Sequence, residues 1–256
     1  MFPVSDDNPT LRTPIMTIVL LVVTWAVWLF IQGGGAPLAL AVSVCDLGLV
    51  PGELTRLARI GDGVPLGVID GQAMACFVDN NPINWATPVL SIFLHGSWGH
   101  IIGNSLYLWV FGNNVEDSMG RMRFLAFYVL TGVLAAMAHI VVSPASPVPT
   151  VGASGAISGI MGAYLLLYPR VSVRTYFPPI FLFRVPAWAV LIFWFGGQLL
   201  AALPQLQPLE RDVSGGVAVW AHVGGFVAGV VLVHLFRNPE FVRRRKAGRD
   251  AKVVWS

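Results

Sequence analysis

Residues 124–169, FLAFYVLTGVLAAMAHIVVSPASPVPTVGASGAISGIMGAYLLLYP, form a stretch without a single charged side chain. It is too long for one ordinary helix, and its middle, Ser143 to Pro149, holds prolines that a helix interior does not tolerate. A helix crosses a bilayer with about 20 apolar residues. The stretch therefore predicts two membrane-spanning helices, at about 122–142 and 151–168, joined by a proline-rich turn.

The composition of the whole chain supports a membrane protein. Only 11% of its 256 residues are charged, 55% are apolar, and the mean hydropathy is +0.71. These values exclude a disordered chain, an ordinary soluble domain and a nucleic-acid binder with a basic face. The two cysteines form no zinc-type spacing, so we expect no metal and no cofactor.

Further uncharged stretches predict the remaining spans, which gives an all-α bundle of six transmembrane helices with one long outer loop. The tails and the loop follow from the span positions. The additional spans lie at about 14–32, 95–113, 185–203 and 217–236. The N-terminal tail then covers 1–12, the membrane domain 13–237 with its outer loop at about 33–94, and the basic C-terminal tail 238–256.

The basic residues predict the orientation. If the N-terminus is cytoplasmic, 13 of the 16 basic residues flank the spans on the inner side, as membrane proteins prefer. Both termini are then cytoplasmic, and the short tails without a transit peptide indicate a prokaryotic plasma membrane. Cys45 and Cys76 both fall in the outer loop, where a disulfide and two separate packed thiols are both possible.

Two polar side chains fall at similar depth on separate predicted helices. Ser154 lies about one turn into the fourth span, and His222 lies about five residues into the sixth, both counted from the outer end. A serine hydroxyl becomes a nucleophile when a neighbouring imidazole accepts its proton. The alternative is structural, with Ser154 bonded to a backbone carbonyl and His222 capping a neighbouring helix.

Small residues favour close contact between these two helices. They are Gly152, Gly155, Gly159 and Gly162 on the fourth span, and Ala221, Gly225 and Gly229 on the sixth. Such spacing lets membrane helices approach backbone to backbone, which would bring Ser154 and His222 within hydrogen-bond reach.

A second group of polar residues lies on the predicted second span, namely His95, His100 and Asn104. His100 and Asn104 are four residues apart and therefore share one helix face. Both side chains can donate hydrogen bonds to a developing oxyanion, together with the backbone N–H groups of Ser154 and Gly155 in the first turn of their helix. A polar clamp between helices is the structural alternative. We assign no role to His95, His139 or His234.

Taken together, these motifs resemble those of the rhomboid intramembrane serine proteases. They are Gly152-Ala153-Ser154-Gly155, His100-x-x-x-Asn104, Val115-Glu116-Asp117-x-x-Gly120-Arg121, and Ala221-His222-x-x-Gly225-x-x-x-Gly229. The resemblance covers roughly residues 85–237. It implies a Ser154–His222 dyad, an oxyanion site from His100, Asn104 and the Ser154 amide, and a structural role for the Glu116 to Arg121 region.

The resemblance also implies the function. Such an endopeptidase cuts single-span membrane proteins near the outer membrane boundary, so its partners are those substrates and the lipid bilayer, with no nucleic acid. Ser158 stands where some relatives carry an aromatic residue stacked on the histidine. The fifth span and the loop 204–216 are candidates for a lateral gate and a cap.

Two other functions are compatible with a membrane bundle. A catalytically inactive rhomboid-like protein would bind membrane helices without cutting them. A small-solute transporter is disfavoured because the spans carry no carboxylate in their middles and the chain shows no two-fold repeat.

Overall fold

A computed structural model describes residues 2–69, 71–177, 179, 181–203 and 219–245. Most of these residues are helical, and the main helices lie where the uncharged stretches predict them. The elements in chain order are β1 (Phe2–Asp6), α1 (Ile15–Ala26), a π-helical turn (Val27–Ile31), α2 (Pro37–Leu47), α3 (Pro51–Thr55), β2 (Gly63–Ile69), β3 (Gln72–Phe77), α4 (Thr87–Leu90), α5 (Trp98–Tyr107), a second π-helical turn (Leu108–Gly112), α6 (Asn113–Met119), α7 (Arg121–Val142), α8 (Ser154–Leu167), β4 (Ser172–Phe177), β5 (Phe181–Pro186), α9 (Ala187–Ala202) and α10 (Val219–Phe236).

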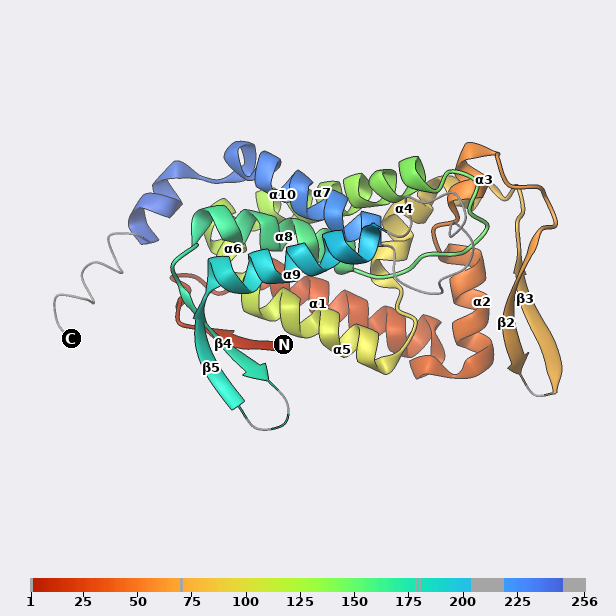
Figure 1. Cartoon of the computed structure of the whole chain (residues 1–256), viewed down its shortest axis with the longest axis horizontal. Coiled ribbons are helices and arrows are strands. Elements are labelled where there is room, and N and C mark those ends of the chain that lie inside the picture. The colour runs from red at the N-terminus through yellow and green to blue at the C-terminus, as the bar shows by residue number, and fades with distance from the viewer. Residues whose placement is uncertain (1, 70, 178, 180, 204–218, 246–256) are drawn as a thin grey trace.

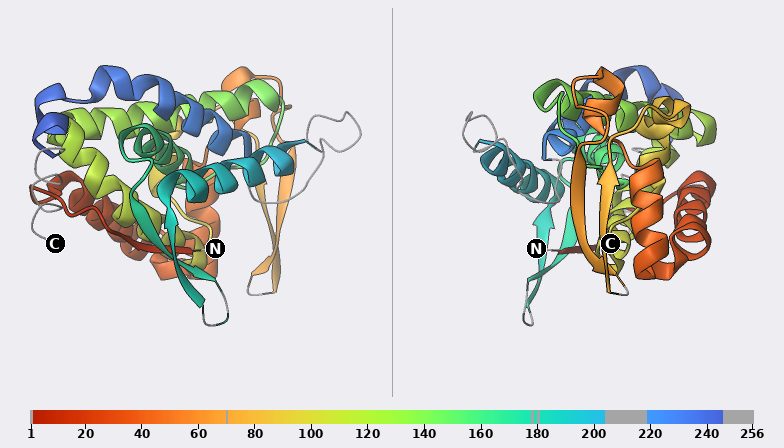
Figure 2. Two further views of the ribbon diagram at one scale, coloured as in Figure 1. Left: turned by 60° about the vertical axis from the view of Figure 1, so that its left-hand side comes forward. Right: turned by 90° about the vertical axis from the view of Figure 1, so that its right-hand side faces the viewer.

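The helices α1, α5, α7, α8, α9 and α10 run side by side along the longest dimension of the molecule (Figure 1). The β4–β5 hairpin joins α8 to α9 at one end, where α6 also lies. The β2–β3 hairpin, α2 and α3 lie at the opposite end, and both hairpins project away from the helices (Figure 2). In the described part of the chain, α7 and α10 are the two helices long and apolar enough to cross a membrane by length and composition.

The prediction of an all-α chain is wrong in two places. Strand β1 pairs with β4, and β4 pairs with β5, in an antiparallel sheet; β2 and β3 form a separate antiparallel hairpin. The first twelve residues are therefore not a free tail, because Phe2–Asp6 are held by a strand about 170 residues further along the chain. In the C-terminal tail, residues 239–245 are helical.

The long outer segment is anchored at several points. A disulfide joins Cys45 on α2 to Cys76 on β3, which decides between the two possibilities that the sequence allows. An isolated antiparallel bridge pairs Leu49 with Thr150, so the segment also contacts the turn before α8. The proposed cap, residues 204–216, lies outside the described residues.

Helix α8 is the centre of the bundle, and its residues from Gly155 to Tyr164 are all buried. It touches α10 through backbone atoms. A Cβ atom on Gly229 would lie 1.9 Å from the Gly159 carbonyl oxygen, and one on Gly225 would lie 2.1 Å from the Gly155 carbonyl oxygen. The predicted close approach of these helices is confirmed, and only glycine fits at these two positions of α10.

Two buried carboxylates organise the end of the bundle that carries α6. Glu116 accepts hydrogen bonds from the Met16 and Thr17 N–H groups, at 3.0 and 2.8 Å, and so caps the first turn of α1. A negative charge at a helix N-terminus is favourable. Asp117 accepts bonds from the Leu11 N–H and the Arg12 guanidinium, at 2.8 and 3.0 Å. The region therefore fixes where the chain enters its first long helix.

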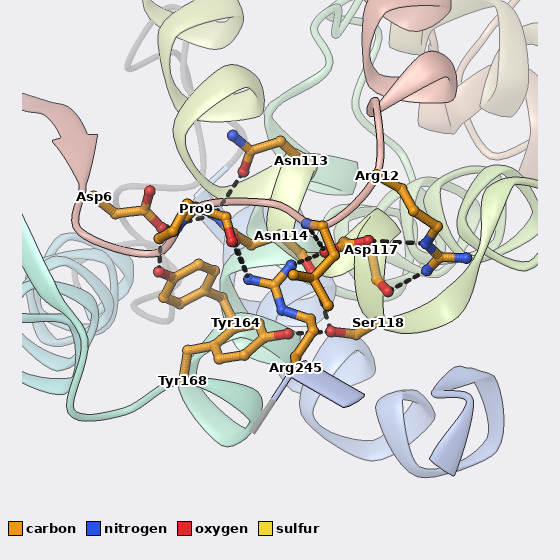
Figure 3. Close-up of polar contacts among 11 residues, drawn as sticks. Asp6, Pro9, Arg12, Asn113, Asn114, Asp117, Ser118, Tyr164, Tyr168 and Arg245 are labelled. Carbon is orange, nitrogen blue, oxygen red and sulfur yellow. Dashed lines mark hydrogen bonds and ion pairs between the residues drawn. The ribbon is translucent and has the colours of Figure 1, made fainter. Parts of the chain in front are cut away.

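A polar cluster at the same end ties the N-terminal segment to the C-terminal tail (Figure 3). Arg245, which is 3% exposed, forms an ion pair with Asp117 and donates to the Asn114 side-chain oxygen at 2.6 Å. Asp6 accepts hydrogen bonds from Asn114 and from the Tyr164 hydroxyl. Because a buried charge is costly without its partner, these contacts hold both ends of the chain against α6 and α8.

We predict that Gly229→Ala separates α8 from α10. Its Cβ would overlap the Gly159 carbonyl, and overpacking of a tight contact destabilises a protein by about 1–3 kcal/mol or more. The midpoint of thermal unfolding in detergent should fall clearly below that of the unaltered protein. The matched control is Gly197→Ala on α9, where a new Cβ meets no atom within 4 Å. Equal midpoints for the two variants would contradict the contact.

A second prediction concerns Asp6. Burial raises the pKa of this carboxyl from 3.8 to about 6, against the opposing effects of Tyr164 and Arg245. Between these two pKa values the Asp6 carboxyl is protonated in the folded protein and ionised in the unfolded chain. The free energy of unfolding therefore decreases as the pH rises from about 4 to about 6, by up to about 3 kcal/mol.

Asp6→Asn should remove this decrease, which thermal unfolding at about pH 3 and about pH 7.5 would show. The variant should match the unaltered protein at the lower pH and exceed it at the higher. Asp7→Asn, which alters an exposed ion pair with Arg174, is the control. The same pH dependence with and without the Asp6 carboxyl would refute the prediction.

Candidate active site

A cavity of about 540 Å³ opens where α5 and α8 begin, beside α9 and α10. Its size is within the usual range for a ligand site. All of the predicted site residues line it, namely Ser154, Gly155, His222, His100 and Asn104. The structure thus brings together side chains from three separate helices that the sequence places far apart.

Ser154 and His222 are hydrogen-bonded across the contact between α8 and α10. The distance from the Ser154 Oγ to the His222 Nε2 is 2.8 Å. Both residues are half-buried and line the cavity, so their side chains are accessible from it. The pair has the geometry that a serine and its general base require.

The start of α8 depends on Gly152. Its φ of +131° is a conformation that side-chain-bearing residues rarely adopt, and its N–H donates to the Ser91 carbonyl at 2.9 Å. The first backbone hydrogen bond of α8 joins the Ile157 N–H to the Ala153 carbonyl. The N–H groups of Ser154 and Gly155 precede it, as is usual in the first turn of a helix, and they lie at the positive end of the helix dipole.

His100 lies directly over Gly152. The Gly96 N–H donates to the His100 Nδ1 at 3.3 Å, which leaves the Nε2 of that ring to carry the proton. A Cβ on Gly152 would lie 2.7 Å from this Nε2 and 3.6 Å from the Ser154 Oγ. The imidazole of His100 therefore lies close to the serine.

Asn104 is held by a histidine to which the sequence analysis assigns no role. The amide nitrogen of Asn104 lies 2.9 Å from the Nε2 of His95, and the rings of His95 and His100 are in edge contact at 4.9 Å between centroids. His95 is itself fully buried, and Gln32 bonds both its backbone N–H and its carbonyl at 2.8 Å. His95 thus positions both members of the predicted oxyanion pair. Its signal in the sequence is its place at the start of the predicted second span, five residues before His100.

The side of His222 away from the serine is contacted by α9. The Nδ1 of His222 lies 2.8 Å from the Oε1 of Gln198, and the ring of Trp194 lies 5.8 Å from the imidazole between centroids. Ser158 instead donates its hydroxyl to the Ser154 carbonyl at 2.6 Å. Gln198 has one signal in the sequence, an amide inside an otherwise apolar predicted span, and no pattern there links it to His222.

The arrangement can perform nucleophilic chemistry on a carbonyl compound. A serine hydroxyl bonded to an imidazole is the arrangement from which a nucleophile and its base are made, and His100, Asn104 and the first residues of α8 line the same cavity. Among the residues that the structure describes, no group of three or more His, Cys, Asp or Glu side chains is placed to hold a metal ion.

Comparison with known proteins finds the rhomboid family over the part of the chain that holds the cavity-lining helices. A family model for the Rhomboid domain matches residues 83–239. The Rhomboid protease GluP of Bacillus subtilis is 41% identical over 93 residues, which are 36% of this chain and 17% of that protein.

Two further relatives match a longer part of the chain. Presenilin-associated rhomboid-like protein A, mitochondrial, of Danio rerio is 31% identical over 150 residues, 56% of this chain and 35% of its own length. Rhomboid-like protein 11, chloroplastic, of Arabidopsis thaliana is 29% identical over 156 residues, 59% of this chain and 52% of its own. The chain thus spans about half or less of the length of these relatives.

Proposed function

This chain belongs to the rhomboid family of membrane proteins, and we propose that it is an intramembrane serine endopeptidase with Ser154 and His222 as its catalytic dyad. The observation that carries the proposal is the 2.8 Å hydrogen bond between these side chains inside a cavity. The similarity to the Rhomboid protease GluP supports it.

The proposed reaction is acyl transfer in two steps. The Ser154 Oγ attacks the substrate carbonyl carbon while the His222 Nε2 accepts the hydroxyl proton. The imidazolium then donates that proton to the leaving amine as the peptide bond breaks. Water, deprotonated by His222, hydrolyses the acyl-enzyme and regenerates the serine.

In the proposed reaction, four hydrogen-bond donors stabilise the tetrahedral intermediate. They are the side chains of His100 and Asn104 and the backbone N–H groups of Ser154 and Gly155. The dipole of α8 adds to this field because its N-terminal end faces the cavity. Donors that are already oriented need no rearrangement as the charge forms.

We propose that six helices span the membrane within residues 13–237, with the outer loop at about 33–94 and both the N-terminal segment 1–12 and the basic tail 238–256 on the cytoplasmic side. Helices occupy all six predicted segments, and within the part of the chain that the structure describes α7 and α10 meet the length and composition test for a span. The Cys45–Cys76 disulfide supports an outer position for the loop, since disulfides persist in oxidising compartments. A prokaryotic plasma membrane stays a prediction from the sequence.

This orientation places the cavity near the outer boundary of the bilayer. The first residues of α5 and α8 line it, and both helices are entered from the outer side in the proposed topology. A single-span substrate must unwind locally to expose a peptide carbonyl, because helical carbonyls are hydrogen-bonded. Cleavage should therefore favour small, helix-weakening residues near that boundary.

We predict that Ser154→Ala and His222→Ala each reduce cleavage by about 10⁴-fold or more, because the nucleophile and its base act as a unit. The measurement is gel analysis of a generic single-span substrate incubated with purified protein in detergent. His234→Ala, an exposed histidine near the other end of α10, is the matched control and should cleave normally. Near-normal cleavage by either dyad variant, with folding intact, would end the proposal.

The oxyanion donors give a separate prediction. His100→Ala and Asn104→Ala should each lower kcat by about 10²–10³-fold and change KM little, because the lost bonds form chiefly in the transition state. Steady-state kinetics on the same substrate measures the two constants. A rise in KM at unchanged kcat would instead assign these side chains to substrate binding.

A further inference from the structure

We propose that Gln198 is a positioning residue that holds His222 in the tautomer needed for catalysis. The proposal rests on the dyad function proposed above and goes beyond it, because it adds a third side chain and a third helix to the reacting pair. The chain of hydrogen bonds runs from the Gln198 Oε1 through the His222 imidazole to the Ser154 Oγ, with 2.8 Å at each step.

The chemistry of the amide decides the tautomer. The Oε1 of a glutamine side chain can only accept a hydrogen bond, so the Nδ1 of His222 must carry the ring proton. In a neutral imidazole the Nε2 then has a free lone pair, directed at the serine hydroxyl. The opposite tautomer would place a hydrogen on Nε2 and leave Ser154 without a base.

Helix packing does not account for Gln198. Helix α9 already rests on α10 through Phe195, which stacks on Phe226 at 4.4 Å between centroids, and through Trp194, which lies 6.3 Å from the same ring. An amide is costly in an apolar helix unless it is hydrogen-bonded, and the partner of this one is the imidazole. Gln198 also lines the cavity, so it faces the site rather than the lipid.

Trp194 acts with Gln198 on the same ring. The two residues are four apart on α9 and therefore share one helix face, and both contact His222. The imidazole is thus hydrogen-bonded at its Nδ1 and contacted by a tilted indole ring from the same helix. This pair replaces the support that Ser158 does not give, because the Ser158 hydroxyl is bonded to backbone.

The position of α9 therefore determines whether the Nδ1 of His222 keeps its hydrogen-bond acceptor. The glycine contacts join α10 to α8, and α9 has no close backbone contact of that kind at Gly196 or Gly197, where a Cβ would meet no atom within 4 Å. A displacement of α9 would remove the acceptor from Nδ1 while Ser154 and His222 stayed together. The dyad would then lose its orientation without being pulled apart.

The first test reads the tautomer directly. ¹⁵N NMR of histidine-labelled full-length protein in detergent distinguishes protonation at Nδ1 from protonation at Nε2, and the His222 signals are assigned by their loss in His222→Asn. We expect the Nδ1–H form in the unaltered protein. Gln198→Met, which keeps the shape but has no strong acceptor, should shift His222 toward the Nε2–H form or a mixture; Gln198→Glu, which keeps an acceptor, should not.

The second test is kinetic and uses the same variants. Gln198→Met should lower kcat about tenfold with KM nearly unchanged, as expected for one buried hydrogen bond left unmade. Gln198→Glu should restore most of kcat. Leu200→Met, at an exposed position of α9, is the control for substituting methionine in this helix and should behave like the unaltered protein.

The outcomes separate the two proposals. If the unaltered protein cleaves substrate but Gln198→Met keeps both its kcat and its Nδ1–H tautomer, the role of Gln198 is overturned and the dyad stands. A loss in Gln198→Met that Gln198→Glu does not restore, with the tautomer unchanged, also overturns it. If the unaltered protein does not cleave at all, the proposed function fails first, and the role of Gln198 fails with it.

Discussion

The structure depends on the backbone contact between α8 and α10. Where Gly225 and Gly229 face the carbonyls of Gly155 and Gly159, a single methyl group would overlap an oxygen atom. This contact sets the distance between two helices that are joined by no short loop. The Ser154 and His222 side chains stand at the end of the contact nearest the cavity, so their hydrogen bond follows from the packing beneath them.

The polar groups of the molecule are sorted toward the two ends of the helices. One end holds the cavity with Ser154, His222 and the predicted oxyanion donors, and the other holds Asp117, Arg245 and their neighbours in a network of buried ion pairs and hydrogen bonds. Between them the described helices carry no charged side chain, and the buried hydroxyls of Thr131 and Ser158 donate to backbone carbonyls. This division suits a protein in a bilayer, where polar side chains are tolerated if they are bonded to each other or face water.

Much of the helical framework could be predicted because the lack of charge over about 20 residues is a strong and local signal. The dyad could also be predicted, since two helices entered from the same side carry a serine and a histidine at similar depth beside small residues. The structure places Ser154 and His222 together, and their catalytic role stays a proposal.

Other features depend on contacts that no local pattern encodes. Strand β1 pairs with a partner about 170 residues away, and β4 and β5 carry arginines within a short segment that reads as a loop. The disulfide could not be decided because cysteine spacing does not determine proximity. Gln198 and His95 were missed because their partners depend on the rotation of whole helices, which the sequence of a uniformly apolar span leaves open.

The proposed dyad requires that the hydrogen bond to His222 makes the Ser154 hydroxyl a nucleophile. The most direct measurement is peptide mapping by mass spectrometry after exposure of the purified protein to a fluorophosphonate, which reacts with activated serines. We expect one covalent adduct, on Ser154, that is absent when His222 is replaced by alanine. An unlabelled Ser154, or equal labelling without the imidazole, would contradict it.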